Sequence, residues 1–85
     1  MQDRIKIRCN DSLQMNAAAL LVQKASNFKS SIYIIRDNRR ANAKSLLGIM
    51  SLGIDENIEL DLEAEGDDAK DALTALAEVL HAEIV

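Results

Sequence analysis

Few side chains in this sequence could take part in covalent or metal chemistry. There is one histidine, His81, and one cysteine, Cys9, and the sequence contains no HExxH, no CxxC and no glycine-rich phosphate loop. A catalytic nucleophile or a metal site needs several such groups close together. We therefore expect no catalytic residues, no metal and no cofactor, and we predict that the protein is not an enzyme.

The single cysteine and the single histidine each have a structural explanation. Cys9 falls in register with Ile5 and Ile7 on the inward face of an alternating segment, which predicts a small core residue. His81 falls at the C-terminal margin of the apolar stripe of the last predicted helix, where the helix dipole favours it. At that place an imidazole would lack a loop and a helix N-terminus able to hold an anion, so we expect no phosphate at His81.

Ser45 is the residue whose surroundings suggest a function. It precedes the short segment 46–52, which we predict to be a helix capped by Ser45 and ended by Gly53. This segment is apolar on every side, so some of its side chains should stay exposed as a contact patch. The pattern leaves two interpretations of Ser45, a helix cap alone or a hydroxyl that is modified on a contact surface.

Two alternating segments, 4–9 and 58–64, predict strands with one buried face and one charged face. The outward side chains are basic on the first strand and acidic on the second, and opposite charges stabilise neighbouring strands. We therefore expect these two strands to pair. Segments 31–36 and 39–42 flank the polar turn Asp37-Asn38 and predict a hairpin.

Apolar residues at helical spacing predict a first helix from about Asn16, its N-cap, to Phe28 and a last helix that starts near Asp67. The predicted buried stripes are Ala17, Ala18, Leu21, Val22, Ala25 and Phe28 in the first helix and Ala69, Ala72, Leu73, Leu76 and Leu80 in the last. Together the elements predict an α+β fold in the order β-α-β-β-α-β-α. We expect an open-faced β-sandwich, a four-stranded antiparallel sheet covered on one side by three helices.

Length and composition limit the remaining possibilities. Eighty-five residues predict a single domain over 1–85, and the lone cysteine and the lack of a long apolar run predict a cytoplasmic protein that does not bind membranes. Residues 1–54 hold nine basic and three acidic residues, whereas residues 55–85 hold one and eleven. A nucleic-acid face would interleave the bases with aromatic residues, and pairing between strands explains the asymmetry better.

The order of these elements and several motifs resemble HPr, the histidine-containing phosphocarrier family of bacterial sugar phosphotransferase systems. The resemblance covers essentially the whole chain, and its most specific part is the segment 42–53, NAKSLLGIMSLG, which is similar to the regulatory serine site of Gram-positive members. Segments 64–68 and 21–25 support it. The resemblance implies the HPr fold and regulatory phosphorylation of Ser45.

The position of the phosphorylated histidine in this family is occupied here by Gln14. A carboxamide nitrogen has no basic lone pair, so it cannot accept a phosphoryl group as an imidazole can. A glutamine at this position with the serine retained resembles the Crh variants, which act in carbon catabolite repression. The resemblance therefore implies a regulatory protein that is not a phosphohistidine carrier.

The partners that the resemblance implies are HPr kinase/phosphorylase, which would phosphorylate Ser45, and a repressor similar to catabolite control protein A. The protein would act on them as a monomer or homodimer through protein contacts, as a corepressor. Asn16 and Ala17 replace an arginine and a proline of the family, which keeps open the alternative of a constitutive interaction domain without a phosphorylation switch. The expected contact residues are Met15, Asn16, Lys44, Leu46, Leu47 and Met50.

Overall fold

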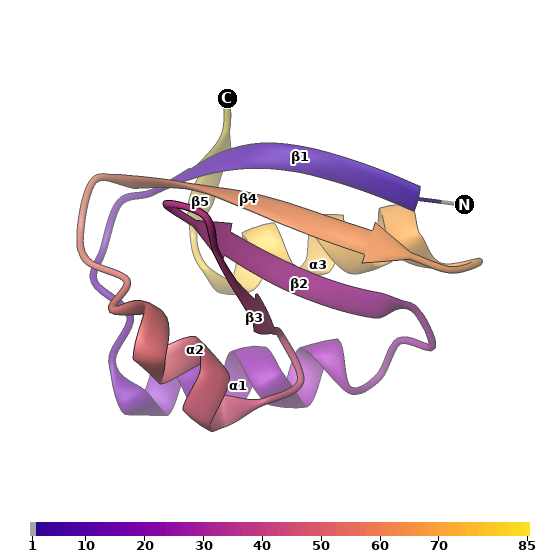
Figure 1. Ribbon diagram of the computed structural model, residues 1–85, viewed down its shortest axis with the longest axis horizontal. Coiled ribbons are helices and arrows are strands. Elements are labelled where there is room, and N and C mark those ends of the chain that lie inside the picture. Colours follow the sequence, from indigo (N-terminus) through magenta and orange to yellow (C-terminus); the bar gives the residue numbers. More distant parts are fainter. Residues whose placement is uncertain (1) are drawn as a thin grey trace.

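A computed structural model describes residues 2–85, and its central element is a five-stranded antiparallel sheet in the order β3-β2-β4-β1-β5 (Figure 1). Alternation of apolar and polar residues makes each long strand two-faced, with the apolar face turned to the core. The strands are β1 (Gln2–Cys9), β2 (Ser31–Arg36), β3 (Arg39–Asn42), β4 (Ile58–Glu65) and β5 (Ala82–Ile84).

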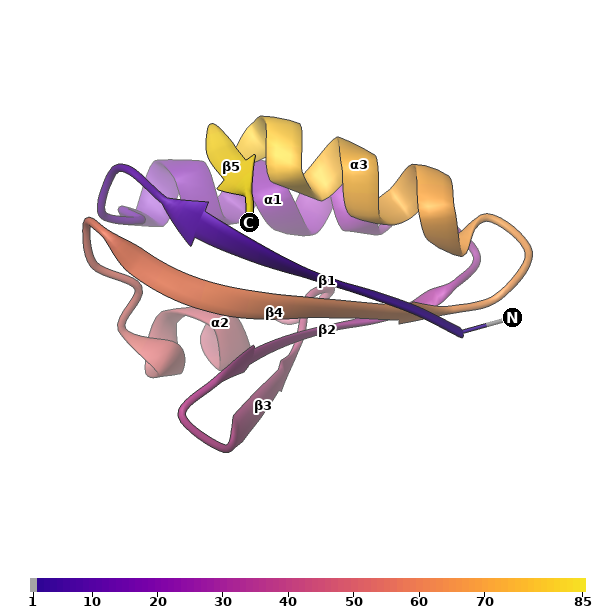
Figure 2. The same cartoon turned by 90° about the horizontal axis from the view of Figure 1, so that it is seen from above.

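Three helices, α1 (Met15–Ala25), α2 (Leu46–Leu52) and α3 (Ala69–Val79), complete the fold. Figure 2 shows α1 and α3 side by side on one face of the sheet, and α2 packs against α1 and β3. Ile49 and Leu52 of α2 belong to the same core as Leu21 of α1, Leu76 of α3 and Leu62 of β4. The predicted α+β sandwich with one open face is therefore confirmed.

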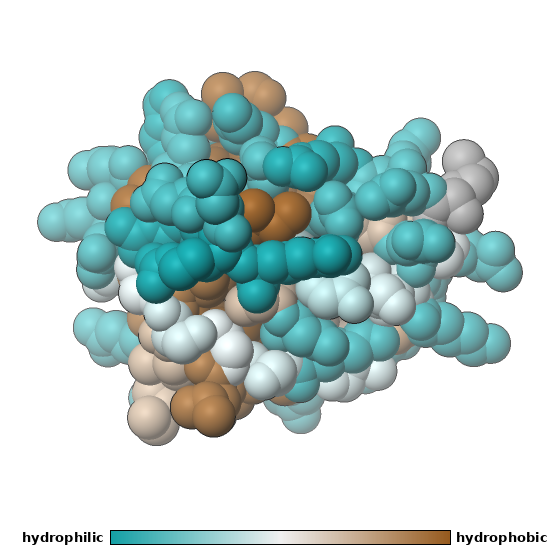
Figure 3. Space-filling model, viewed as in Figure 1, coloured by the Kyte–Doolittle hydropathy of each residue, from teal (hydrophilic) through white to brown (hydrophobic). Residues whose placement is uncertain are grey.

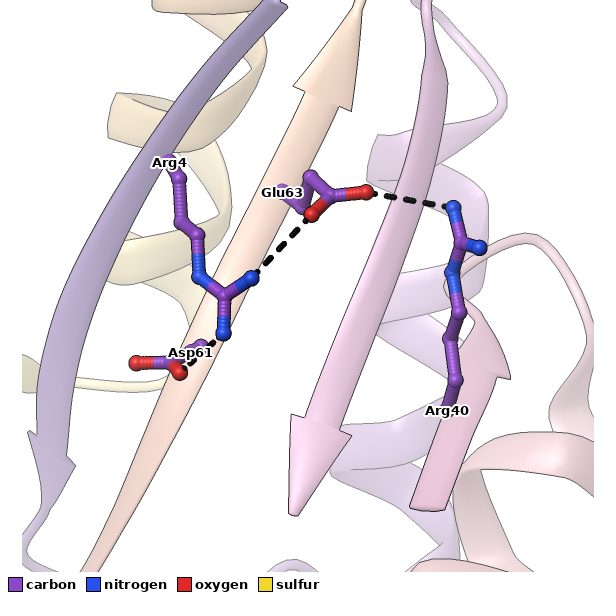
Figure 4. Close-up of polar contacts among 4 residues, drawn as sticks. All are labelled: Arg4, Arg40, Asp61 and Glu63. Atoms are coloured by element: carbon purple, nitrogen blue, oxygen red, sulfur yellow. Dashed lines mark hydrogen bonds and ion pairs between the residues drawn. The ribbon is translucent and has the colours of Figure 1, made fainter. Parts of the chain in front are cut away.

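The predicted pairing of the basic and acidic strands is also confirmed. β1 and β4 are antiparallel neighbours over their whole length, with Arg4 opposite Glu63 and Arg8 opposite Glu59. On the open face, Arg4 contacts Asp61 at 2.5 Å and Glu63 at 3.4 Å, and Glu63 also accepts from Arg40 at 3.1 Å (Figure 4). The hydrogen bond with Asp61 raises the pKa of Arg4. Arg4 and Arg40 on this face are therefore paired with carboxylates of β4.

The number of strands was predicted wrongly, because the sheet has five strands and not four. β5 pairs with the outer edge of β1, with Ala82 opposite Cys9, and the Val85 amide donates to the Lys6 carbonyl at 2.9 Å. Three residues are too short to show an alternating pattern. Only their position beside β1 makes them a strand.

His81 was placed wrongly on the last helix. α3 ends at Val79, Leu80 is its C-cap, and His81 has a φ of 51° in the connection to β5. This left-handed conformation reverses the chain toward β1. The helix begins at Ala69, near the predicted start. The side chain of its N-cap, Asp68, accepts hydrogen bonds from residues 29 and 30 and does not cap α3.

The first helix is shorter than predicted and its N-cap is Gln14, so the assignment of Asn16 as N-cap was wrong. The Gln14 carbonyl accepts the Ala18 amide at 2.9 Å, and Asn16 lies exposed in the first turn. At the other end the Ser26 hydroxyl donates to the Val22 carbonyl at 2.8 Å. Phe28 follows the helix and is partly buried against the core.

The hairpin between β2 and β3 has the predicted bounds. Asp37 and Asn38 form its turn with φ values of 48° and 67°. Two consecutive residues with positive φ match the type I′ turn, whose twist fits a hairpin. Asparagine and aspartate tolerate this conformation better than other residues with a side chain, which explains why they occupy the turn.

Candidate regulatory site around Ser45

Ser45 is the N-cap of α2, as predicted. Its backbone is extended, with φ −115° and ψ 111°, and its Oγ accepts the Gly48 amide at 3.2 Å. Its carbonyl accepts the Ile49 amide at 3.0 Å, the first bond of the helix. The helix that it caps therefore positions the hydroxyl, and Ser45 is half-buried there.

Gly48 leaves room for the Ser45 hydroxyl. A Cβ at position 48 would lie 3.3 Å from the Ser45 Oγ and 3.4 Å from the Ser45 Cβ. Both distances are short for a carbon atom, so a side chain at position 48 would crowd the hydroxyl that accepts the Gly48 amide. Gly48 was not predicted as a site residue, although its place three residues after a capping serine was a usable signal.

The predicted contact patch on α2 is exposed in part. Leu47 has 82% of its surface exposed and Leu46 and Met50 have 37% each, whereas Ile49 and Leu52 are buried. Figure 3 shows hydrophobic residues gathered over α2, while much of the rest of this view is hydrophilic. Leu47 is therefore the apolar side chain beside Ser45 that is most available to a partner.

Lys44 is half-buried and is held in place by hydrogen bonds. Its Nζ donates to the Phe28 carbonyl at 2.8 Å, and its amide donates to the Asn42 Oδ1 at 2.8 Å. The Ser45 amide donates to the Asn42 carbonyl at 3.0 Å. This turn fixes the direction in which the chain enters α2.

Helices α1 and α2 are antiparallel, which separates the predicted contact residues into two groups. The Leu13 amide before α1 donates to the Ile54 carbonyl after α2 at 2.9 Å. At the other end, Lys44 before α2 reaches Phe28 after α1. A seven-residue helix is roughly 10 Å long, so Gln14, Met15 and Asn16 lie at the opposite end of α2 from Ser45.

Gln14 and His81 line the same shallow pocket of about 300 Å³. Its walls are the loop before α1, the first turn of α1, and the end of α3 with the residues after it. The Asn10 side chain holds this connection by donating to the His81 carbonyl at 3.3 Å. The premise that His81 lies away from the loop was wrong, since the fold brings the histidine to the loop that contains Gln14.

Cys9 is a core residue, as its register predicted. It is 1% exposed on the inward face of β1, and burial raises the pKa of its thiol. A thiol with a raised pKa is a weaker source of thiolate at neutral pH.

Six of the nine basic residues in the first half of the chain have side chains that form a hydrogen bond or an ion pair within residues 2–85. Arg4, Arg8 and Arg40 pair with carboxylates of β4, and Lys44, Arg36 and Arg39 donate to backbone carbonyls. This use of the charge favours the structural explanation over a nucleic-acid face. Within residues 2–85, no cluster of three histidine, cysteine, aspartate or glutamate side chains could hold a metal, and no helix is long and apolar enough to cross a membrane.

Comparisons with known proteins agree with the geometry. A family model described as the PTS HPr component phosphorylation site matches residues 1–82. The chain is 37% identical over 84 residues to the HPr-like protein Crh of Bacillus subtilis (strain 168), which covers 99% of each protein.

Two solved structures are similar to this fold. The phosphocarrier protein HPr from Bacillus anthracis has a TM-score of 0.81 and 42% identity, covering 93% of this chain and 94% of that one. The solution structure of Bacillus subtilis Crh has a TM-score of 0.76 and 38% identity, covering 94% and 95%.

Proposed function

This chain belongs to the HPr family of phosphotransferase-system proteins, and we propose that it is a regulator switched by phosphorylation of Ser45 and not a phosphohistidine carrier. The observation that carries the proposal is the geometry of Ser45. Its Oγ lies at the N-terminal end of α2, on a half-buried residue two positions before Leu47, which is 82% exposed. The 37% identity with a Crh protein supports the same assignment.

In the proposed reaction, HPr kinase/phosphorylase transfers the γ-phosphoryl group of ATP to Ser45 Oγ, which loses its proton, and ADP is released. The product carries a phosphate with a charge of about −1.5 to −2 at pH 7. Lys44 is engaged with the Phe28 carbonyl, so the phosphate would remain available to a partner. An arginine or lysine of that partner would bind the phosphate while Leu47 enters an apolar pocket.

The partner that we propose is a repressor similar to catabolite control protein A, with the phosphorylated chain as corepressor. Ser45 and Gln14 lie at opposite ends of α2, so one partner surface of ordinary size covers both. Such a surface would also contact Met15 and Asn16. Asn16, in place of the family's arginine, would tune the affinity for that partner.

Loss of the carrier function is proposed from the chemistry of Gln14. Its side chain is exposed at the start of α1, where the family has its histidine, and a carboxamide cannot form a phosphoramidate. Incubation with the phosphohistidine donor that labels authentic HPr should give no acid-labile phosphate on this chain. A His81→Ala variant distinguishes the two positions, because label that disappears in this variant would show that His81 has taken the carrier role.

The kinase assay tests the main proposal. Incubation with ATP and HPr kinase should add one phosphate to the wild type and to Ser51→Ala, but none to Ser45→Ala. Ser51 is the matched control because it lies in the same short helix and its hydroxyl donates to the Gly48 carbonyl at 2.7 Å. Absence of label on Ser45 under conditions that modify authentic HPr would refute the switch.

A second candidate, a constitutive interaction domain, is favoured by apolar side chains that are exposed without any label, including Met15 at 62% and Leu20 at 59%. The two candidates differ in the effect of phosphorylation on binding. A switched regulator should be captured by the repressor only after phosphorylation. Equal capture before and after phosphorylation would favour the constitutive domain.

A further inference from the structure

Two arginines of the β2–β3 hairpin donate to the last carbonyl groups of α2. Arg36 Nη1 reaches the Leu52 carbonyl at 2.9 Å and also the Gly53 carbonyl. Arg39 Nη2 reaches the Leu52 carbonyl at 3.1 Å, and its Nη1 reaches the Ser51 carbonyl at 3.4 Å. We call Arg36 and Arg39 the arginine clamp.

The arginine clamp supplies partners where α2 has none of its own. The last four carbonyls of any helix lack partners within it, and a seven-residue helix is marginal in isolation. Two positive charges at the C-terminal end also complement the helix dipole. Only Ile49 and Leu52 of α2 are buried in the core, so the clamp is a second attachment of this helix to the sheet.

At its other end, α2 is capped by the atom that phosphorylation would modify. The Gly48 amide donates to Ser45 Oγ at 3.2 Å, and this oxygen becomes a phosphate ester oxygen in the proposed reaction. An ester oxygen is a weaker acceptor than a hydroxyl. A helix that depended on this cap alone would change its stability with each cycle of phosphorylation and dephosphorylation.

We propose that Arg36 and Arg39 are positioning residues for Ser45. They hold the C-terminal end of α2 on the hairpin, so that α2 stays folded whether or not the Ser45 hydroxyl caps it. The phosphate then changes the charge of the surface and leaves the helix that presents it in place. The meaning for regulation rests on the proposed function, whereas the effect on α2 does not.

Hydrogen exchange measured by NMR on the whole chain tests this inference without a kinase. The variant Arg36→Gln/Arg39→Gln keeps most of the side-chain length and removes both charges. It should speed exchange of the Ile49 and Gly53 amides at least about tenfold while the amides of β4 change little. The control Arg8→Gln/Arg40→Gln removes the same charge from the open face of the sheet and should leave α2 unchanged.

Combination with Ser45→Ala gives a readout that general loss of stability would not produce. With the arginine clamp intact, Ser45→Ala should raise exchange in α2 only a few fold. In the Arg36→Gln/Arg39→Gln background, Ser45→Ala should raise the exchange rate of the α2 amides by a clearly larger factor, because neither end of the helix is then held. Equal factors in the two backgrounds would overturn the proposal, as would uniform exchange of α2 and β4 in the double variant.

Phosphorylation of the same variants separates this inference from the proposed function. HPr kinase should label the double variant more slowly than the control variant, because a folded α2 then presents Ser45 for a smaller fraction of the time. If the kinase labels no form of the chain, the proposed function fails and the exchange data still decide the clamp. The single variants Arg36→Gln and Arg39→Gln give the same test if the double variant does not fold.

Discussion

The Nζ of Lys44 lies 2.8 Å from the carbonyl oxygen of Phe28, so the residue before Ser45 is attached to the chain that follows α1. The lysine therefore connects the ends of two helices. Together with the bond from Leu13 to Ile54 at the other end, it fixes α1 and α2 as an antiparallel pair. Lys44 is in this way a structural support of the candidate site.

Replacement of Lys44 by methionine keeps the apolar part of the side chain and removes the donor to Phe28. We expect the free energy of unfolding to fall by about 1 kcal/mol, since a partly exposed bond from a charged donor is lost. Urea unfolding followed by circular dichroism measures this. Lys24→Met is the control, because Lys24 is exposed and its side chain makes no hydrogen bond or ion pair within residues 2–85. Equal losses in both variants would contradict a specific role for Lys44.

Ser45→Ala removes the side-chain cap of α2. Loss of a serine cap lowers the free energy of unfolding by about 1 kcal/mol in typical cases, and we expect this value or less because the arginine clamp also holds the helix. The comparison is Ser51→Ala, which should stay within about 0.5 kcal/mol of the wild type. Denaturation midpoints of the two variants that coincide would argue against a capping role for Ser45.

Gly66→Ala should be one of the most damaging single changes in this chain. Gly66 has a φ of 148°, and a Cβ there would lie 2.5 Å from the Ser30 Oγ and 2.8 Å from the Ser30 Cα. Backbone strain and overlap with a buried residue together should cost at least about 2 kcal/mol. Gly53 also has a positive φ, but a Cβ at this position would lie 3.7 Å from its nearest neighbour. Gly53→Ala should therefore lower the free energy of unfolding by only about 1 kcal/mol. The prediction fails if thermal unfolding ranks the two variants in the reverse order.

Asp68 should make the stability depend on pH in the acidic range. The hydroxyl of Ser30 and the amides of Lys29 and Ser30 donate to its carboxylate and hold its pKa below the usual value. Because the pKa is lower in the folded than in the unfolded state, this stabilisation is present at neutral pH and is lost as the pH falls through the folded pKa.

Asp68→Asn should therefore reduce the difference between the urea midpoints measured at neutral pH and at about pH 3. Asp67→Asn serves as the control, since this neighbouring carboxylate is exposed and makes none of these hydrogen bonds. An unchanged acid dependence in Asp68→Asn would mean that other carboxylates cause it.

The periodicity of the sequence was enough to predict most of the fold. Strict alternation in β1 and β4 and the opposite signs of their outward charges predicted two adjacent strands, and the turn residues Asp37 and Asn38 predicted the hairpin. These signals are local, because each strand shows its own buried face and each turn its own backbone requirement. Ser45 as the cap of α2 and Gly53 as its end were predicted for the same reason.

Tertiary contacts decided what local patterns do not encode. β5 is a strand only because it lies along β1, and His81 shares a pocket with Gln14 only because the chain reverses after α3. The arginines that hold α2 lie 12 to 17 residues before the carbonyls that they bind. The sequence by itself thus determined the elements other than β5, the capping serine and the absence of a histidine at position 14. Only the folded chain decided which residues support that serine. The supporting hydrogen bonds join different elements, so they depend on how the elements pack and not on the spacing of apolar residues within one helix or strand.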